Sequence, residues 1–195
     1  MNTKSPSLPM RCATALKEWA SVLQAMDRGE QLVLIRKGGL IEPGSGFEVV
    51  NDIFVFYPTF EHQAVNYLRE DYRGYFEQAS RARAPEGSVR FECFGTAVST
   101  HSVNEPALIK RLEAFHIFNE AFVTQRLKWQ PDAPMVLVIV RVYRLAQPQM
   151  LPVDPSYAGC KSWVELKTSV LLEQAIPVLS DAVFRERLQQ LEAIL

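Results

Sequence analysis

The sequence predicts an α+β fold, a mostly antiparallel sheet or partly open barrel with flanking helices. Short β-branched and aromatic runs come in hairpin-like groups, and segments with helical spacing lie between the groups instead of alternating one-for-one with strands. The composition, with 48% apolar and 22% charged residues, is that of an ordinary globular chain. The 195 residues suit one domain. We expect residues 1–11 to form a flexible tail and residues 12–195 a single domain that ends in a helix.

The first half is expected to contain two helices and a hairpin. Apolar residues at helical spacing predict a helix over residues 12–27. A short β-rich run predicts a strand over 32–35. Strands over 47–50 and 53–57, separated by Asn-Asp, predict an antiparallel hairpin. A segment rich in aromatic and charged residues predicts a helix over 61–79.

The second half is expected to contain the most strongly predicted strand, over residues 135–145. Its first six residues are all apolar, which predicts a central strand covered on both faces. Asn104 as N-cap and Pro106 in the first turn predict the start of a helix that continues through Ala114 and, after a break, toward Arg126. The other elements are expected to be a strand over 89–98, an irregular stretch over 148–156, a strand over 161–167, and a last helix capped by Ser180.

Charge and cysteine content limit the classes of function. The net charge of −1 predicts no strong bulk attraction to nucleic acid or to an anionic membrane, although a local basic patch is compatible with it. Three widely spaced cysteines argue against a disulfide framework, and no signal peptide is visible, so a cytoplasmic location is expected. The apolar run 135–140 is too short to cross a bilayer. No CxxC, HxxxH or HExxH spacing occurs, so no metal site and no cofactor are expected.

Six segments, taken in order, resemble a bacterial family known as domain of unknown function 1802. They are ALKEWA (15–20), LIRKGG (34–39), FEV (47–49), YPTFEHQ (57–63), RVYRL (141–145) and YAGCKSWVEL (157–166). The resemblance covers roughly residues 13–166. The family has no assigned activity. Its association with restriction-endonuclease-type domains implies a nucleic-acid context.

A second resemblance concerns the fold. A helix, then Gly29, then a strand that ends in Arg36 is similar to the opening of ASCH domains, which are PUA-like β-barrels that bind RNA or modified nucleotides. The ASCH pattern carries a lysine shortly after the glycine. This chain has Glu30 and Gln31 there and so departs from the pattern.

The segment Arg36-Lys37-Gly38-Gly39 is the first candidate site. Two cations at a strand end, followed by glycines that allow close approach of backbone N–H groups, are suited to an anion such as phosphate. A strand exit with a tight turn and solvated charges is the alternative.

The segment from Tyr57 to Gln63 is the second candidate. Thr59 is predicted to cap the following helix, which would place His62 and Gln63 in its first turn, where backbone donors favour anions. Capping accounts for Thr59 alone, so His62 is the open question. His62 could act as a base or as a hydrogen-bond donor.

The third candidate lies at Cys160, Ser162 and Trp163. Cys160 would be a nucleophile if His62 lay near it, and Trp163 would form a stacking wall. A buried structural cysteine is the alternative. Asp154 with Glu165 and Lys167 is loosely similar to the acidic-plus-ExK pattern of metal-assisted nucleases.

We therefore expect a module that binds nucleic acid or a phosphate-bearing small molecule at the strand ends. Arg36, Lys37 and the Gly38-Gly39 backbone would hold the anion, and Thr59, His62 and Gln63 would orient the ligand. The alternatives are an enzyme, either a metal-assisted nuclease or a hydrolase that uses His62 with Cys160, and a purely structural or interaction protein. The sequence leaves the oligomeric state open.

Overall fold

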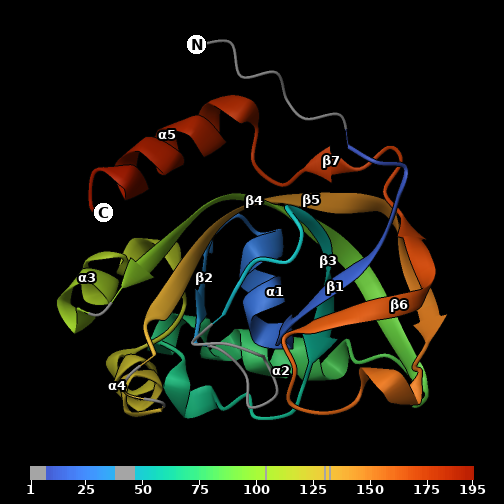
Figure 1. Cartoon of the computed structure of the whole chain (residues 1–195), viewed down its shortest axis with the longest axis horizontal. Coiled ribbons are helices and arrows are strands. Elements are labelled where there is room, and N and C mark those ends of the chain that lie inside the picture. Colours follow the sequence, from blue (N-terminus) through green and yellow to red (C-terminus); the bar gives the residue numbers. More distant parts are fainter. Residues whose placement is uncertain (1–7, 38–46, 104, 130, 132) are drawn as a thin grey trace.

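A curved seven-stranded sheet is the frame of the structure (Figure 1). The computed structural model describes residues 8–37, 47–103, 105–129, 131 and 133–195. The strands are β1 (Arg11–Trp19), β2 (Val33–Arg36), β3 (Ile53–Thr59), β4 (Ser88–Val103), β5 (Met135–Pro152), β6 (Trp163–Leu171) and β7 (Ile176–Pro177). Their order is β2-β5-β4-β3-β1-β6, and β7 pairs with β5.

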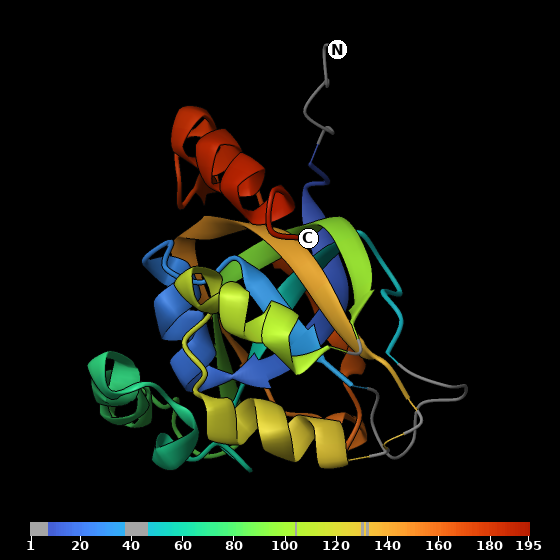
Figure 2. The same ribbon diagram turned by 90° about the vertical axis from the view of Figure 1, so that its left-hand side faces the viewer.

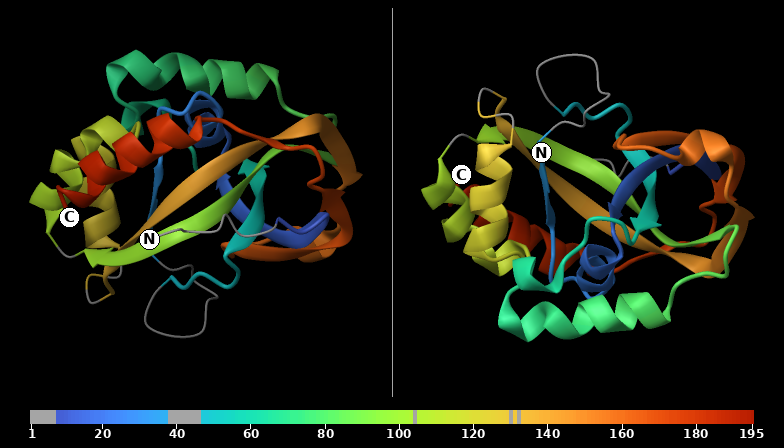
Figure 3. Two further views of the ribbon diagram at one scale, coloured as in Figure 1. Left: turned by 90° about the horizontal axis from the view of Figure 1, so that it is seen from above. Right: turned by 90° about the horizontal axis from the view of Figure 1, so that it is seen from below.

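Five helices lie around this sheet in the described part of the chain. They are α1 (Ala20–Asp27), α2 (Arg73–Arg81), α3 (Pro106–Arg111), α4 (Glu120–Lys128) and α5 (Asp181–Glu192). Helix α1 packs against β3 and β5, and α2 packs along α1. Helices α3 and α4 lie together at one end of the sheet (Figure 2), and α5 crosses the outer side of β5 (Figure 3).

The strand pairing confirms the predicted α+β class with a mostly antiparallel sheet. Only β1 and β3 are parallel among the described pairs; Ala15 lies opposite Val55 and Trp19 opposite Thr59. The amide side chain of Gln149 in β5 bonds both the N–H and the C=O of Leu171 in β6, at 2.8 Å each. The second half of β5 thus meets the edge strand β6 through a side chain, and the sheet does not close into a barrel.

Strand β5 is central, as its apolar run predicts. All six residues from 135 to 140 are buried, and this half of the strand pairs with β2 on one side and β4 on the other. The predicted irregular stretch 148–156 is wrong in its first part, because β5 continues to Pro152. Residues 149–152 pair with residues 88–91 of β4, and this long-range pairing extends the strand past its prolines.

The predicted helix over 12–27 is wrong in its first half, because residues 11–19 form β1. This strand lies between β3 and β6 and is covered on both faces, so both Ala15 and Leu16 are fully buried. In a strand that is buried on both faces, apolar and polar residues do not alternate along the chain. Its apolar residues can therefore recur at the spacing expected for a helix. The true helix α1 begins only at Ala20. Of the expected tail, residues 1–7 lie outside the described residues, and Arg11 begins β1.

The predicted hairpin of residues 47–50 with 53–57 is also wrong. Residues 53–59 form β3, but residues 47–50 form no strand. Both edges of β3 are already occupied, by β1 and by β4, so no place is left for a hairpin partner.

The predicted helix over 61–79 is broken into two short 3-10 turns, Val65–Tyr67 and Glu70–Tyr72, followed by α2. His62 adopts a left-handed backbone with φ 63°, and Leu68 forms a β-bridge with Phe118. Neither conformation is compatible with a continuous α-helix. Long-range pairing therefore overrides local helical preference in this segment.

The helix predicted from Asn104 to Arg126 is likewise divided. Helix α3 begins at Pro106 after Glu105 as N-cap, and Asn104 lies outside the described residues. Between α3 and α4 the chain is extended at His116, and Asn119 caps α4 by accepting a hydrogen bond from the Phe122 N–H.

Several predicted elements are confirmed with small shifts of their bounds: β2, β4, β6 and α5. Ser180 caps α5, since its hydroxyl accepts a hydrogen bond from the Val183 N–H at 3.4 Å. Serine is a favoured residue at this position.

Gly95 in β4 packs against the aromatic rings of Phe54 and Phe56 in the neighbouring strand β3. A Cβ atom at this position would lie 2.9 Å from Cζ of Phe56 and 3.3 Å from Cε2 of Phe54, both fully or nearly fully buried. We expect Gly95→Ala to lower the free energy of unfolding by about 1–3 kcal/mol, measured by urea denaturation. The matched control is Gly74→Ala in α2, whose nearest neighbour would be 3.7 Å away. That change is expected to raise the free energy of unfolding by about 0.5–1 kcal/mol. An unchanged stability of Gly95→Ala would contradict the close packing of these rings.

Candidate functional site

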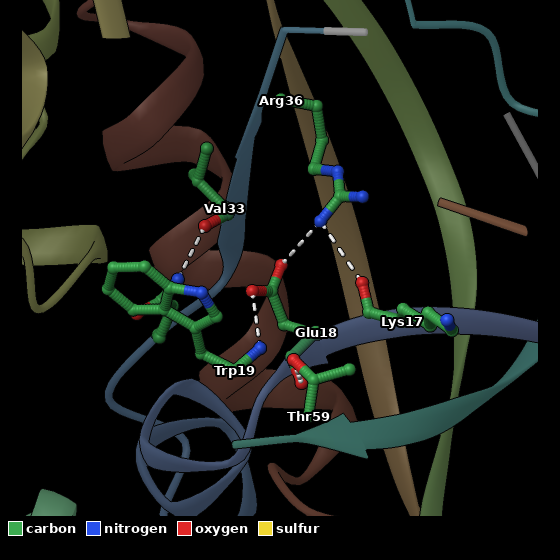
Figure 4. Close-up of polar contacts among 7 residues, drawn as sticks. Lys17, Glu18, Trp19, Val33, Arg36 and Thr59 are labelled. Carbon is green, nitrogen blue, oxygen red and sulfur yellow. Dashed lines mark hydrogen bonds and ion pairs between the residues drawn. The ribbon is translucent and has the colours of Figure 1, made fainter. Parts of the chain in front are cut away.

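Three strands end close together beside the start of α1, and their last residues bring polar groups to one place (Figure 4). The parallel strands β1 and β3 end in register at Trp19 and Thr59. Strand β2 ends at Arg36, whose side chain reaches back to Lys17 and Glu18 of β1. We name the group of Glu18, Arg36, Thr59 and Arg126 the Glu18–Arg36 centre.

The core of the Glu18–Arg36 centre is a buried ion pair. Nη1 of Arg36 lies 3.2 Å from Oε2 of Glu18, and the two side chains are only 15% and 8% exposed. The same Nη1 donates to the Lys17 carbonyl at 3.1 Å. Oε1 of Glu18 accepts a hydrogen bond from the backbone N–H of Trp19 at 2.7 Å. Both carboxylate oxygens thus have a donor, as a buried charge requires.

Two of the predicted polar residues, Thr59 and Gln63, form hydrogen bonds that connect β3 and the loop after it to β1 and α1. The Thr59 hydroxyl donates to the Glu18 carbonyl at 3.0 Å, which ties β3 to β1. The Gln63 side-chain oxygen accepts from the Ser21 N–H at 3.3 Å, in the first turn of α1. Thr59 is therefore not the helix cap that its position in the sequence predicts, because it lies within β3. Gln63 supplies a capping contact instead, to a helix far away in the sequence.

A second guanidinium, that of Arg126 on α4, lies near the ion pair. Arg126 is half-buried and lies over the Phe122 ring, with 5.2 Å from its Cζ to the ring centroid. Burial lowers the pKa of Arg126, the positive charge of Arg36 lowers it further, and Glu18 acts in the opposite direction. Arg126 forms no ion pair with a carboxylate of the described residues. Arg36 is thus paired with Glu18, while Arg126 has no carboxylate partner among the described residues, which leaves an excess of positive charge.

Aromatic rings adjoin the Glu18–Arg36 centre. The Arg36 guanidinium lies over the Phe47 ring at 5.1 Å, and Phe47 stacks on Trp163 with ring centroids 5.8 Å apart and an interplanar angle of 20°. Nε1 of Trp163 donates to the Glu48 carbonyl at 2.9 Å, which fixes the indole. Trp163, the residue predicted to stack, thus packs on Phe47, and Phe47 in turn contacts Arg36.

A family model described as "Domain of unknown function (DUF1802)" matches residues 15–190. The chain belongs to the DUF1802 family. The predicted family resemblance is therefore confirmed, over a longer range than its six segments span. None of the curated proteins matches the chain.

Three solved structures from Zymomonas mobilis are similar to this DUF1802 chain, all of ASCH. A ZmASCH mutant with a serine replaced by alanine has a TM-score of 0.44 and 13% identity, over 94% of this chain and 99% of that chain. A ZmASCH mutant with a tyrosine replaced by phenylalanine has a TM-score of 0.46 and 10% identity, over 80% and 90%. A third ASCH structure has a TM-score of 0.42 and 11% identity, over 91% and 93%.

The first candidate segment also includes Lys37, Gly38 and Gly39. Lys37 is buried, and its amine donates to the Leu127 carbonyl of α4 at 3.1 Å. Gly38 and Gly39 lie outside the described residues. Of the two described residues of this segment, Arg36 thus lies in the Glu18–Arg36 centre and Lys37 binds α4.

Other predicted residues lie around this part of β1 without joining the Glu18–Arg36 centre. Ser162 is buried, and its carbonyl accepts from the Lys17 N–H at 2.8 Å. Tyr57 belongs to a separate cluster of buried apolar residues, where it packs edge-to-face on Phe91 and Tyr157. Burial raises the pKa of Tyr57, and the neighbouring Tyr157 raises it further.

His62 and Cys160 show no sign of a catalytic pair. Both side chains are exposed, and neither contacts the other in the described structure. His62 follows β3 in a loop, so the predicted position in a helical turn is wrong. The reason is the extended backbone at Ala64, which starts a 3-10 turn where an α-helix is predicted.

The acidic residues of the nuclease alternative also have separate partners. Asp154 accepts from the Ser156 N–H at 2.8 Å, and Glu165 accepts from the Thr14 hydroxyl at 3.2 Å. Within the described residues, no three His, Cys, Asp or Glu side chains gather as a metal site would require. No described helix is long and apolar enough to cross a membrane.

Sequence reasoning missed two members of the Glu18–Arg36 centre, Glu18 and Arg126. Glu18 stands in a segment that reads as an amphipathic helix, where a charged residue is expected to face water. A strand covered on both faces makes the same residue a buried carboxylate. Arg126 comes near Arg36 only through the packing of α4, and no local pattern reports that.

Proposed function

We propose that the Glu18–Arg36 centre binds a nucleotide unit, either free or within single-stranded nucleic acid. The observation that carries this proposal is a pair of guanidiniums beside stacked aromatic rings: Arg36 is paired with the buried Glu18, and Arg126 has no carboxylate partner among the described residues. Guanidiniums match phosphate geometry, and aromatic rings stack on nucleobases.

The free donors of Arg36 support a role in phosphate binding. Both of its hydrogen bonds to described residues leave from Nη1, and Figure 4 shows the other two nitrogens directed away from Glu18. Glu18 thus holds the guanidinium in one orientation, and the other N–H groups have no hydrogen-bond partner among the described residues. A guanidinium fixed in this way loses little conformational entropy when it binds a phosphate.

The charge balance favours a nucleotide unit over a long duplex. The chain has 21 Lys and Arg against 22 Asp and Glu, so it has no excess of basic residues for many phosphate contacts. One or two phosphates and a base require only a local positive site. A single-stranded segment or a mononucleotide meets that requirement.

Fluorescence anisotropy with labelled ten-nucleotide RNA, DNA and duplex probes, at several salt concentrations, tests the proposal. We expect saturable binding of single strands that weakens with salt, and competition by nucleoside monophosphates but not by nucleosides. Arg126→Gln is expected to weaken binding about tenfold or more and to reduce the salt slope by about 0.7 per lost phosphate contact.

Arg185→Gln is the matched control, because Arg185 is exposed on α5, far along the chain from the Glu18–Arg36 centre. It is expected to bind as the parent does. Absence of saturable binding for every single-stranded and mononucleotide probe would refute the proposal. If Arg126→Gln bound the probes with the same affinity as the parent, the binding site would lie outside the Glu18–Arg36 centre.

A further inference from the structure

A groove of about 750 Å³ adjoins the Glu18–Arg36 centre, and the lining includes Lys17 of β1 and Thr59 of β3. Residues of α1, α2, β3 and β4, together with the turn around Tyr157, line it. Apolar side chains, among them Leu23, Phe56 and Val89, contribute to its surface. Its volume lies within the range of about 300–1,000 Å³ found for small-molecule sites.

Lys17 stands at one end of this groove. Successive side chains of a strand point to opposite faces, so Lys17 lies on the groove side while Glu18 lies in the Glu18–Arg36 centre. The Lys17 amine donates to the Gly159 carbonyl at 3.0 Å and lies 5.9 Å from the centroid of the Tyr57 ring. Both partners are uncharged. The amine forms no ion pair with a carboxylate of the described residues.

The charges around Lys17 leave its ammonium poorly compensated. Burial lowers the pKa of Lys17, and the positive charge of Lys161 lowers it further; Glu61 and Cys160 act in the opposite direction. The Glu61 side chain is exposed, so water screens its effect. An anion placed against Lys17 would relieve both the burial penalty and the repulsion from Lys161.

Carboxylates also line the groove away from Lys17, among them Glu86 and Asp154, and two of the lining carboxylates have cationic partners. Asp27 pairs with Arg144 at 2.7 Å, and Glu92 pairs with Arg90 at 2.8 Å. Arg83 lies over the Phe60 ring at 4.9 Å and forms no ion pair with a described carboxylate. Among the lining cations, Lys17 and Arg83 thus have no ion pair with a described carboxylate, and an anionic head group is favoured at these two side chains only.

We infer that this groove is a second binding site, which takes a small amphiphilic anion. The apolar body of the ligand lies along the groove, and its carboxylate or similar head group binds the Lys17 ammonium. The inference does not depend on nucleotide binding, since the Lys17 side chain, which binds the head group, is not part of the Glu18–Arg36 centre, although Thr59 lines the groove as well. The charge complementarity at Lys17 selects an anion over a neutral or cationic amphiphile.

Titration with 8-anilinonaphthalene-1-sulfonate at pH 7.5, followed by fluorescence, tests the inference. We expect saturable binding of one dye molecule per chain. Decanoate is expected to displace the dye, and decanol, which lacks the charge, is expected to need at least about tenfold higher concentration for the same displacement. Lys17→Gln is expected to weaken dye binding about tenfold, and Lys17→Arg to retain it. Ala82→Trp, at an exposed position of the groove wall, is expected to block the groove.

Lys110→Gln is the matched control, since Lys110 is exposed on α3 and does not line the groove. It is expected to bind the dye as the parent does, and circular dichroism checks that each variant is folded. Three results would each overturn the inference: no saturable dye binding by the parent, equal displacement by decanol and decanoate, or unchanged binding by both Lys17→Gln and Ala82→Trp. Competition by a mononucleotide is expected to be absent, and full displacement by one would place the dye in the Glu18–Arg36 centre instead.

Discussion

Arg36→Met is expected to lower the free energy of unfolding by about 3–5 kcal/mol, because it leaves the Glu18 carboxylate buried without its cation. The Glu18 side chain is only 8% exposed, so water cannot replace the guanidinium without movement of the strands. Methionine keeps the length of the side chain and can still contact the Phe47 ring. Urea denaturation, with far-ultraviolet circular dichroism as the signal, measures the change.

A second variant separates the loss of the cation from a simple loss of packing. In the double variant Glu18→Gln with Arg36→Met, no buried charge is left alone, and we expect most of the lost stability to return. Arg185→Met on the surface of α5 is the control and is expected to change the stability by less than about 0.5 kcal/mol. A loss below about 1 kcal/mol for Arg36→Met alone would show that Glu18 is solvated in the absence of Arg36, against its burial in this structure.

The second large effect is expected from pH, through the buried His116. Nε2 of His116 lies 3.1 Å from the Ile109 carbonyl, and Nδ1 accepts a hydrogen bond from the Phe118 N–H at 3.2 Å. This pairing assigns the proton of the neutral ring to Nε2. A second proton on Nδ1 would face the Phe118 N–H, and burial opposes the charge as well. Burial and the nearby Arg69 lower the pKa of His116 from 6.5 to about 4, against a raising effect of the Ile109 hydrogen bond.

The sign of the pH effect follows from proton binding. Between pH 6.5 and 4 the unfolded chain binds a proton at His116 and the folded chain does not, so stability falls as the pH falls through this window. The contribution of His116 is fully present above pH 6.5. Its loss on acidification amounts to about 3 kcal/mol, since one pKa unit corresponds to about 1.36 kcal/mol.

Denaturation of parent and variants at pH 7, 5.5 and 4.5 measures this effect as a difference, which cancels the groups that they share. His116→Gln is expected to be less stable than the parent at pH 7, and the gap is expected to shrink as the pH falls. His62→Gln, at an exposed position, is expected to keep the pH dependence of the parent. A constant gap between His116→Gln and the parent from pH 7 to 4.5 would contradict a buried neutral His116.

Some parts of the fold and site could be predicted from sequence, since local pattern determines them. The six consecutive apolar residues at the start of β5 are typical of a strand covered on both faces, and they form one. Ser180 marks the start of α5 by its own hydrogen bond, which needs no distant partner. Arg36 at a strand end is placed correctly for the same reason, because the glycines after it mark the end of β2.

Only tertiary structure determined the identity of β1 and, with it, the Glu18–Arg36 centre. The spacing of Leu16, Trp19 and Ala20 is compatible with a helix, and the choice of a strand depends on pairing with β3 and β6, which are about 40 and 150 residues away. That pairing buries Glu18 and places Lys17 on the opposite face. The sequence by itself determined the α+β class, the central strand and the cation at the end of β2. The partners of that cation depend on backbone hydrogen bonds between distant strands and on the packing of α4, and no local pattern encodes either.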